Sequence, residues 1–241
     1  MEVWNFGVSG YGPIQYLVQM EDIIRLRPKA VLIGFCLRND WHDNVFWERY
    51  GYYAPYAVNN DGILEIQGYP IPNNKKFGGH HTLKIDEFLR FLHTNSKIYA
   101  LIHERLKIRY ASGQQEGLVG YGENDIYKPD APKRDEAIAI NTLILKEIKS
   151  RLDQAGIPLF LLFASTKMEY DTSTSDFDPK AAREALSATA TALDIPYLDP
   201  TEQLGLDDFF ERDGHWNRAG HTKVAALLSP WLEAQLGLQE K

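Results

Sequence analysis

A carboxylate and an imidazole stand two residues apart near the carboxyl end of the chain, in the stretch FFERDGHWNRAGH. In extended backbone, residues i and i+2 point to the same side, so the carboxylate of Asp213 can reach one nitrogen of His215. That contact fixes the tautomer of the imidazole and leaves its other nitrogen free as a general base. The alternative is an ordinary loop aspartate beside a surface histidine, with Trp216 and Asn217 wedging and capping the loop.

An amide side chain directly follows an apolar run in the stretch IGFCLRNDWHDN. At the carboxyl end of a buried strand, the side chain of Asn39 is well placed to donate a hydrogen bond to an oxyanion. Asn-Asp is also common turn chemistry, and the same dipeptide recurs at 124–125 with no strand ahead of it. The sequence therefore leaves two interpretations of Asn39, an oxyanion donor and a plain turn residue.

Glycines cluster in the opening stretch NFGVSGYGPIQYL. They let backbone N–H groups approach a ligand closely, and Gly10 can supply an oxyanion donor. Ser9 lies among them, but the run from Gly7 to Tyr11 departs from the Gly-x-Ser-x-Gly pattern of a nucleophile elbow at its last position. A tight turn between a strand and a helix accounts for the glycines equally well.

Length and composition bound the function classes. With 241 residues and 44% hydrophobic composition, the chain can bury one sizeable core. The net charge of −7 argues against a nucleic-acid partner or an anionic membrane surface, because both require clustered lysine and arginine. No stretch approaches the roughly 20 apolar residues of a membrane span, and Met1 opens no basic-then-apolar signal peptide. The single cysteine, Cys36, excludes a disulfide framework and a cysteine-based metal site. Compartment and oligomeric state stay open.

Alternating strands and helices are predicted to position these residues. Continuous apolar runs predict buried strands covered on both faces, at 3–6, 29–36, 157–165 and 195–199. Apolar stripes of helical spacing predict helices at 13–27, 133–155 and 178–194 and after Asn217, which suits an N-cap. This alternation implies an α/β fold with a parallel, doubly wound sheet.

Residues 41–132 interrupt the alternation. Strand-like flanks around Asn59-Asn60-Asp61-Gly62 predict a hairpin. The pattern of residues 82–110 predicts two helices, and the polar stretch 111–133 predicts a loop. We expect a single domain over 1–241, in which the region of about 41–132 is an insertion where the substrate-facing loops of open α/β sheets lie.

Taken in order, the stretches WNFGVSGYGPIQYL, AVLIGFCLRND and DGHWNRAGH resemble motif blocks of the SGNH (GDSL-type) hydrolase superfamily. The resemblance spans roughly residues 3–44 and 133–235. Its last block has the form Asp-x-His-Trp, which is similar to the branch of exopolysaccharide O-acetyltransferases and related esterases. It implies a three-layer α/β/α fold with a mostly parallel, flavodoxin-like sheet.

The same resemblance implies roles for individual residues. Gly10 and Asn39 become oxyanion-hole donors, His215 the general base and Asp213 its orienting partner, with no cofactor and no metal. Ser9 falls inside the glycine block and is then not the nucleophile. The implied activity is hydrolysis of O-acyl esters, including carbohydrate O-acetyl esters, by a Ser-His-Asp mechanism on a small-molecule or carbohydrate ester substrate.

The chain departs from the family pattern in one consequential way, because it contains no Gly-Asp-Ser nucleophile motif. In the family that motif follows the first strand, which lies between the strands corresponding to 3–6 and 29–36. We therefore expect a sheet that lacks its first strand, an inactive chain as it stands, and self-association through the exposed sheet edge. A second departure is Leu37, which replaces the glycine of the asparagine block.

Three other functions remain open at this point. A sugar hydroxyl in place of water would make the protein a carbohydrate O-acetyltransferase. A non-catalytic relative would bind carbohydrate, with the aromatic residues of 41–56 stacking on sugars, although a hydrophobic cluster under a long loop explains them as well. A metal-dependent hydrolase would use four positions as ligands: Asp213, His215, His221 and the pair His80-His81.

Overall fold

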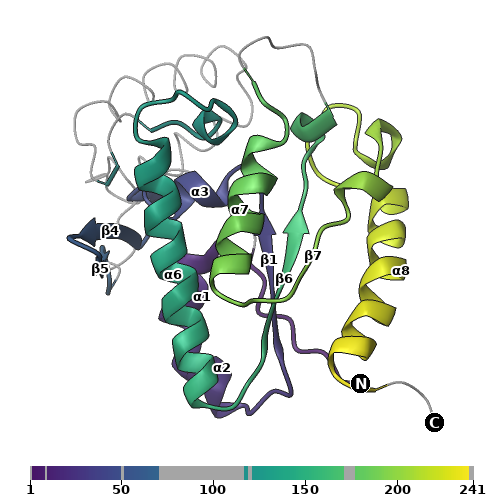
Figure 1. Ribbon diagram of the computed structural model, residues 1–241, viewed down its shortest axis with the longest axis horizontal. Helices are drawn as coiled ribbons and strands as arrows, with labels where there is room; N and C mark the ends of the chain where they lie inside the picture. The colour runs from purple at the N-terminus through teal and green to yellow at the C-terminus, as the bar shows by residue number, and fades with distance from the viewer. Residues whose placement is uncertain are drawn as a thin grey trace, which may run out of the picture.

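The protein has an α/β fold around a three-stranded parallel sheet in the order β1-β6-β7 (Figure 1). The computed structural model describes residues 2–8, 10–49, 52–70, 117–118, 121–170 and 177–238. The strands are β1 (Val31–Cys36), β6 (Leu159–Ala164) and β7 (Tyr197–Leu198). In the register of the central pair, Val31 lies opposite Leu159 and Cys36 opposite Ala164. The predicted strands at 29–36, 157–165 and 195–199 are confirmed.

Helices return the chain between the parallel strands. β6 is preceded by α6 (Arg134–Gln154), and the link from β6 to β7 contains α7 (Ala181–Ala192). Because the strands are parallel, their carboxyl ends meet at one edge, the upper edge in Figure 1. The short helices that follow the strands at that edge are α3 (Asp40–Asp43), η2 (Lys167–Tyr170) and η3 (Thr201–Gln203). The loops with the predicted chemistry therefore share one end of the sheet.

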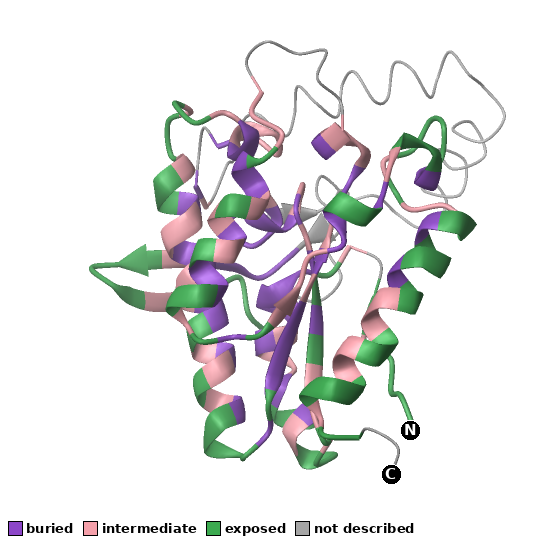
Figure 2. Ribbon diagram, turned by 45° about the vertical axis from the view of Figure 1, so that its right-hand side comes forward, coloured by how far each residue is buried: buried purple, intermediate pink, exposed green. Residues whose placement is uncertain are grey.

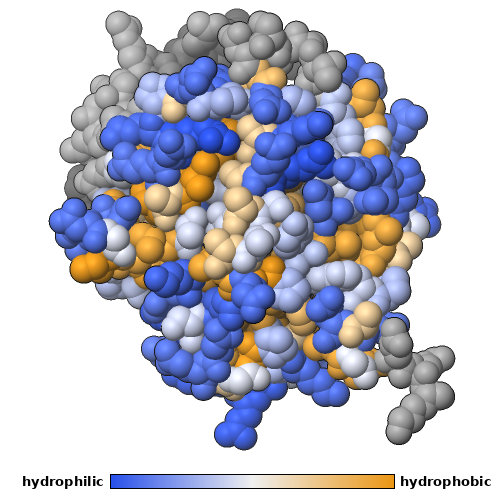
Figure 3. Space-filling model, in the orientation of Figure 1, coloured by the Kyte–Doolittle hydropathy of each residue, from blue (hydrophilic) through white to orange (hydrophobic). Residues whose placement is uncertain are grey.

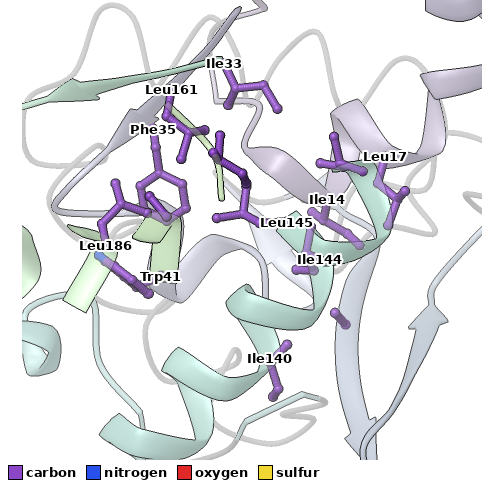
Figure 4. Packing of buried hydrophobic residues seen from close by; sticks show 14 of the residues in the cluster. Ile14, Leu17, Ile33, Phe35, Trp41, Ile140, Ile144, Leu145, Leu161 and Leu186 are labelled. Atoms are coloured by element: carbon purple, nitrogen blue, oxygen red, sulfur yellow. The ribbon is translucent and has the colours of Figure 1, made fainter. Parts of the chain in front are cut away.

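The main hydrophobic core lies between one face of the sheet and the helices α1 (Pro13–Val18), α2 (Met20–Arg25) and α6 (Figure 4). The predicted helix 13–27 divides into α1 and α2 at Gln19, whereas the predicted helices at 133–155 and 178–194 are confirmed. Burial of each large apolar side chain contributes roughly 1.5–3 kcal/mol. The core includes Ile14, Leu17, Ile33, Phe35, Ile140, Ile144 and Leu161.

The opposite face of the sheet is covered unevenly (Figure 2). Phe160 of β6 packs edge-on against Trp231 of α8 (Arg218–Gln235), with ring centroids 5.6 Å apart. On β1, however, Leu32 and Gly34 are exposed although they lie opposite Phe160 and Leu162. Helix α8 thus covers β6 but not β1, and the prediction of two covered faces is wrong for β1.

An antiparallel hairpin, separate from the main sheet, packs on the helices. It consists of β4 (Tyr56–Asn60) and β5 (Ile63–Gln67), joined through Asp61 and Gly62, which both have positive φ. Two consecutive positive φ angles are those of the tight turn that matches the twist of a hairpin. The predicted hairpin is therefore confirmed. A shorter antiparallel pair, β2 (Glu48–Arg49) with β3 (Tyr52–Tyr53), precedes it. The two helices predicted at 82–110 lie outside the described residues.

The amino-terminal segment is not a strand, so the prediction for residues 3–6 is wrong. Val3 and Trp4 are 76% and 51% exposed, and no described strand pairs with this segment. The physical reason is the missing neighbour: an extended segment becomes a strand only where another strand takes up its backbone hydrogen bonds. The residues described here contain none between this segment and β1.

Hydrophilic side chains cover most of the face seen in Figure 3, and apolar side chains form separate patches there. No helix within the described ranges combines the length and the apolar character needed to cross a bilayer.

Candidate active site

Asp213 and His215 form a close pair on the loop before α8. A carboxylate oxygen of Asp213 contacts Nδ1 of His215 and also accepts the His215 backbone N–H at 3.0 Å. The hydrogen bond from the His215 side chain is the main cause that lowers the pKa of the Asp213 carboxyl. With Nδ1 held by the carboxylate, Nε2 is the nitrogen that can accept a proton. The His215 side chain is 84% exposed, so the pair faces solvent.

The backbone closes this loop beneath the pair. Phe209 and Trp216 form an antiparallel bridge, and the N–H of Phe210 donates to the carbonyl of His215 at 3.1 Å. The bridge explains why Asp213 and His215 point the same way, because the residues between its two sides form a narrow loop.

Asn217 joins this loop to α8 as the predicted N-cap. Its Oδ1 accepts the N–H groups of Ala219 and Gly220, at 2.8 and 3.1 Å. Its Nδ2 donates to the carbonyls of Asp207 and Phe209, at 2.7 and 3.0 Å. One side chain therefore satisfies the first turn of α8 and holds both sides of the loop.

The fit of α8 beside this loop depends on a glycine. A Cβ on Gly220 would lie 2.4 Å from the carbonyl oxygen of Asp208, closer than any side chain allows. The Asp208 carboxylate also accepts a hydrogen bond from Lys223 at 2.7 Å, which lowers the pKa of the Asp208 carboxyl. Helix and loop are thus in direct contact at the first turn.

The turn after β6 holds the His215 loop against the end of the sheet. The backbone N–H of Lys167 donates to the carbonyl of Gly214 at 3.3 Å, and Lys167 Nζ donates to the carbonyl of Glu211 at 2.9 Å. A Cβ placed on Gly214 would lie 3.9 Å from Arg38 Nη1 and 4.0 Å from Thr166 Cβ. The loop is therefore bonded to the turn after β6 and lies beside the guanidinium of Arg38.

A buried carboxyl group shapes that turn from inside. Glu169 accepts hydrogen bonds from the backbone N–H of Thr166 and from the hydroxyl of Tyr127. Burial raises the pKa of Glu169 to about 7, although the hydrogen bonds from Tyr127 and Thr166 act in the opposite direction. The support of the His215 loop therefore contains a group that titrates near neutral pH.

Asn39 follows the end of β1 after Leu37 and Arg38 and immediately precedes α3. Its Nδ2 donates to Oδ2 of Asp43 at 2.7 Å. The next residue, Asp40, is buried and accepts the backbone N–H of Cys36 at 2.9 Å, which ties the start of α3 to the last residue of β1. Leu37 is fully buried in the core.

Gly10 lies in a turn closed by the N–H of Tyr11 and the carbonyl of Val8 at 2.9 Å. Its φ is +82°, a left-handed conformation in which glycine carries no steric penalty. Two residues on, Gly12 packs so closely on α3 that an added Cβ would lie 3.0 Å from Asn44 Oδ1. Ser9 is outside the described residues.

Both predicted loops have neighbours in the segment that follows β1. Gly12, two residues after Gly10, packs on Asp40 and Asn44, and Gly214 of the His215 loop lies near Nη1 of Arg38. Asn39 lies in the same segment, next to Arg38. The arrangement provides amide donors and an imidazole with a fixed tautomer at one edge of the sheet, while the catalytic roles of these residues stay predictions.

Sequence reasoning missed the buried polar residues behind the site. Asp43, Asn44, Asn141 and Glu169 are all buried. The one available signal was Asn141, a polar residue beside the apolar stripe of the predicted helix at 133–155. The others stand in an insertion or a loop, where no periodicity marks a buried position.

The described residues bear on two of the alternative binding functions. Trp41 and Trp47 are buried, and Trp41 packs on Phe35 with ring centroids 4.9 Å apart, so these indoles are not surfaces for stacking sugars. Within the described ranges, no cluster of three or more histidine, cysteine or acidic side chains could hold a metal. His221 contacts the ring of Trp216 instead, and His80-His81 lies outside those ranges.

Comparisons with known protein families, with curated proteins and with solved structures give no match for this chain. What the protein does is therefore inferred from its own residues and their arrangement.

Proposed function

We propose that this chain carries the base and the oxyanion donors of an SGNH-type serine hydrolase that cleaves O-acyl esters, with carbohydrate O-acetyl esters as the preferred class. The observation that carries the proposal is the Asp213–His215 pair, on a loop that is hydrogen-bonded to the turn following the parallel strand β6. Asn39 and the Gly10 turn supply donors at the same edge of the sheet. Together they match the acid–base and electrostatic requirements of acyl transfer.

In the proposed reaction, a serine hydroxyl attacks the ester carbonyl and passes its proton to Nε2 of His215. Asp213 keeps the imidazole oriented and stabilises the imidazolium. The amide of Asn39 and the backbone N–H of Gly10 donate to the oxyanion. The imidazolium then gives its proton to the departing alcohol. Water attacks the acyl-enzyme in the reverse sequence and releases the acid, whereas a sugar hydroxyl in place of water completes acyl transfer.

The serine is proposed to come from a further segment of the same polypeptide that pairs with the outer edge of β1. Among the described strands, β1 has a partner only on its β6 side, and Leu32 and Gly34 are exposed. An added strand there would give a flavodoxin-like, three-layer domain and place its carboxyl end beside Asn39. Without that strand, the open edge favours self-association, which concentration-dependent gel filtration measures.

The experiment compares turnover of p-nitrophenyl acetate by the 241-residue chain and by a version extended at its amino terminus to include a Gly-Asp-Ser strand from its own gene. We expect turnover only in the extended protein, and its loss in the His215→Ala variant. Turnover by the 241-residue chain that depends on Ser9, tested with Ser9→Ala, would contradict the assignment. So would an extended protein that keeps full activity without His215.

A further inference from the structure

Two consecutive buried side chains at the end of α3 contact the segments that carry the proposed oxyanion donors. The side chain of Asp43, 2% exposed, accepts the hydrogen bond from Asn39. Asn44, fully buried, accepts the backbone N–H of Ile14 in the first turn of α1 at 3.0 Å. We propose that Asp43 and Asn44 are positioning residues that hold the Asn39 amide and the Gly10 turn in place for one oxyanion. This inference rests on the proposed function.

Asp43 determines which way the Asn39 amide points. A carboxylate offers only acceptors, so Asn39 must turn its NH₂ group rather than its carbonyl towards it. That bond, at 2.7 Å, uses one of the two Nδ2 hydrogens and leaves the other for an oxyanion. The second carboxylate oxygen of Asp43 lies 3.4 Å from Nδ1 of His42, whose ring stacks on Phe46. Asp43 is thus held between two partners and cannot follow a rotation of Asn39.

Asn44 fixes the other donor through a connected network. Its Nδ2 donates to Oδ1 of Asn141 on α6 at 2.7 Å while its Oδ1 holds Ile14. Ile14 lies only two residues after Gly12. Gly12 itself packs against Oδ1 of Asn44. The bond to Ile14 and the close packing of Gly12 therefore restrain the start of α1, and with it the adjacent Gly10 turn, relative to the end of α3.

The contacts of Asp43 with Asn39 and of Asn44 with Ile14 are coupled, because Asp43 and Asn44 are neighbours in the chain. A displacement at the end of α3 would move both donors together, which keeps their separation constant. Donors of fixed separation cost no reorganisation when charge develops on the substrate oxygen. Neither side chain needs to touch the substrate to have this effect.

The first test uses nuclear magnetic resonance on the 241-residue chain, with Asp43→Ala, Asp43→Asn and the control Asp199→Ala. Asp199 accepts the N–H of Thr201 beyond β7, at the opposite edge of the sheet from β1. We expect the two Nδ2 proton resonances of Asn39 to be widely separated in the unaltered chain and in the control. They should collapse towards each other in Asp43→Ala and recover in part in Asp43→Asn, which keeps an acceptor. Asn39 resonances that do not respond to Asp43→Ala would overturn the proposal.

The second test adds acetate, the product of the proposed deacetylation, and follows the Gly10 and Asn39 amides. We expect the dissociation constant of acetate to be about tenfold higher for Asp43→Ala than for the unaltered chain. This factor corresponds to the loss of one hydrogen bond, from the Asn39 amide to the charged acetate. In Asn44→Ser, whose hydroxyl is too short to reach both partners, the Gly10 amide should lose its response while Asn39 keeps its own. Acetate that leaves both amides unmoved in the unaltered chain would overturn the oxyanion site, and the proposed function with it. If Asp43→Ala alters the Asn39 resonances but still binds acetate normally, the positioning role alone would be overturned.

Discussion

The Asn39 side and the His215 side of the candidate site are supported in different ways. Behind Asn39, the side chains of Asp43 and Asn44 are buried; Asp43 accepts a hydrogen bond from Asn39, and Asn44 accepts one from Ile14. The Asp213–His215 pair is exposed, and its loop is held by hydrogen bonds from Lys167 and Asn217 to backbone carbonyls. The contrast follows the chemistry, because an oxyanion donor must not move, whereas a base must exchange protons with the substrate and with water.

Removing the centre of the buried network should have the largest effect. Asn44→Ala breaks the bonds to Ile14 and Asn141 and leaves buried polar groups without partners, so we expect a loss of about 3 kcal/mol in the free energy of unfolding. Urea denaturation measures it. Asn60→Ala, in the exposed hairpin, is the matched control and should cost less than about 0.5 kcal/mol. Equal losses in the two variants would remove the distinction between a rigid and an exposed side.

The His215 side should depend on pH through Glu169. Its folded pKa of about 7 lies above the usual 4.5, so the folded protein holds this proton more tightly than the unfolded chain does. The contribution of Glu169 to the free energy of unfolding is therefore fully present below about pH 4.5. As the pH rises through about 7, this contribution of roughly 3 kcal/mol is lost. Glu169→Gln should flatten this part of the curve of unfolding free energy against pH. A curve of unchanged slope in the variant would assign the dependence to other groups.

A side chain added at Gly220 of α8 should destabilise the His215 side of the site and leave the Asn39 side unchanged. Gly220→Ala forces a Cβ onto the Asp208 carbonyl, and we expect a loss of about 2 kcal/mol together with faster amide exchange at His215. Gly205→Ala is the control, because no atom lies within 4 Å of its added Cβ. Exchange at Asn39 should stay unchanged in both variants. Faster exchange there would show that the two sides are mechanically coupled.

The smallest effect is expected from the exposed contact between the β6 turn and the His215 loop. Lys167→Ala removes the hydrogen bond to the Glu211 carbonyl but keeps the backbone bond to Gly214, so the loss should stay below about 1 kcal/mol. Amide exchange across 211–215 is the measurement. Lys149→Ala, which loses only its ion pair with Asp153 on α6, should not alter it. An equal change in both variants would argue that Lys167 does not restrain the loop.

Periodicity and turn chemistry were sufficient to predict the parallel strands, the long helices and the hairpin. Each depends on a local pattern: the continuous apolar run before Cys36, the repeat from Ile140 through Ile148, and the Asn-Asp-Gly turn. The pairing of Asp213 with His215 was also predictable, because their spacing already places them on one side of an extended loop.

What failed was everything that depends on a distant neighbour. Residues 3–6 have strand-like composition, but no described strand pairs with them. For the aromatic residues at 41 and 47 the sequence left sugar stacking and a hydrophobic cluster open, and their burial decides for the cluster. The buried carboxyl of Glu169 follows the same rule, since its environment is created by Tyr127, 42 residues away. Such positions are decided by packing, which a single sequence does not display.

Arg38 connects the inserted region to the loop that carries His215. Its Nε lies 3.3 Å from Asn124 Oδ1 and 3.4 Å from Glu123 Oε1, and Nη1 lies beside Gly214. One guanidinium thus spans from the returning end of the insertion to the loop that carries His215. A displacement of the turn at 122–125 would therefore be passed through this side chain to the loop that carries His215.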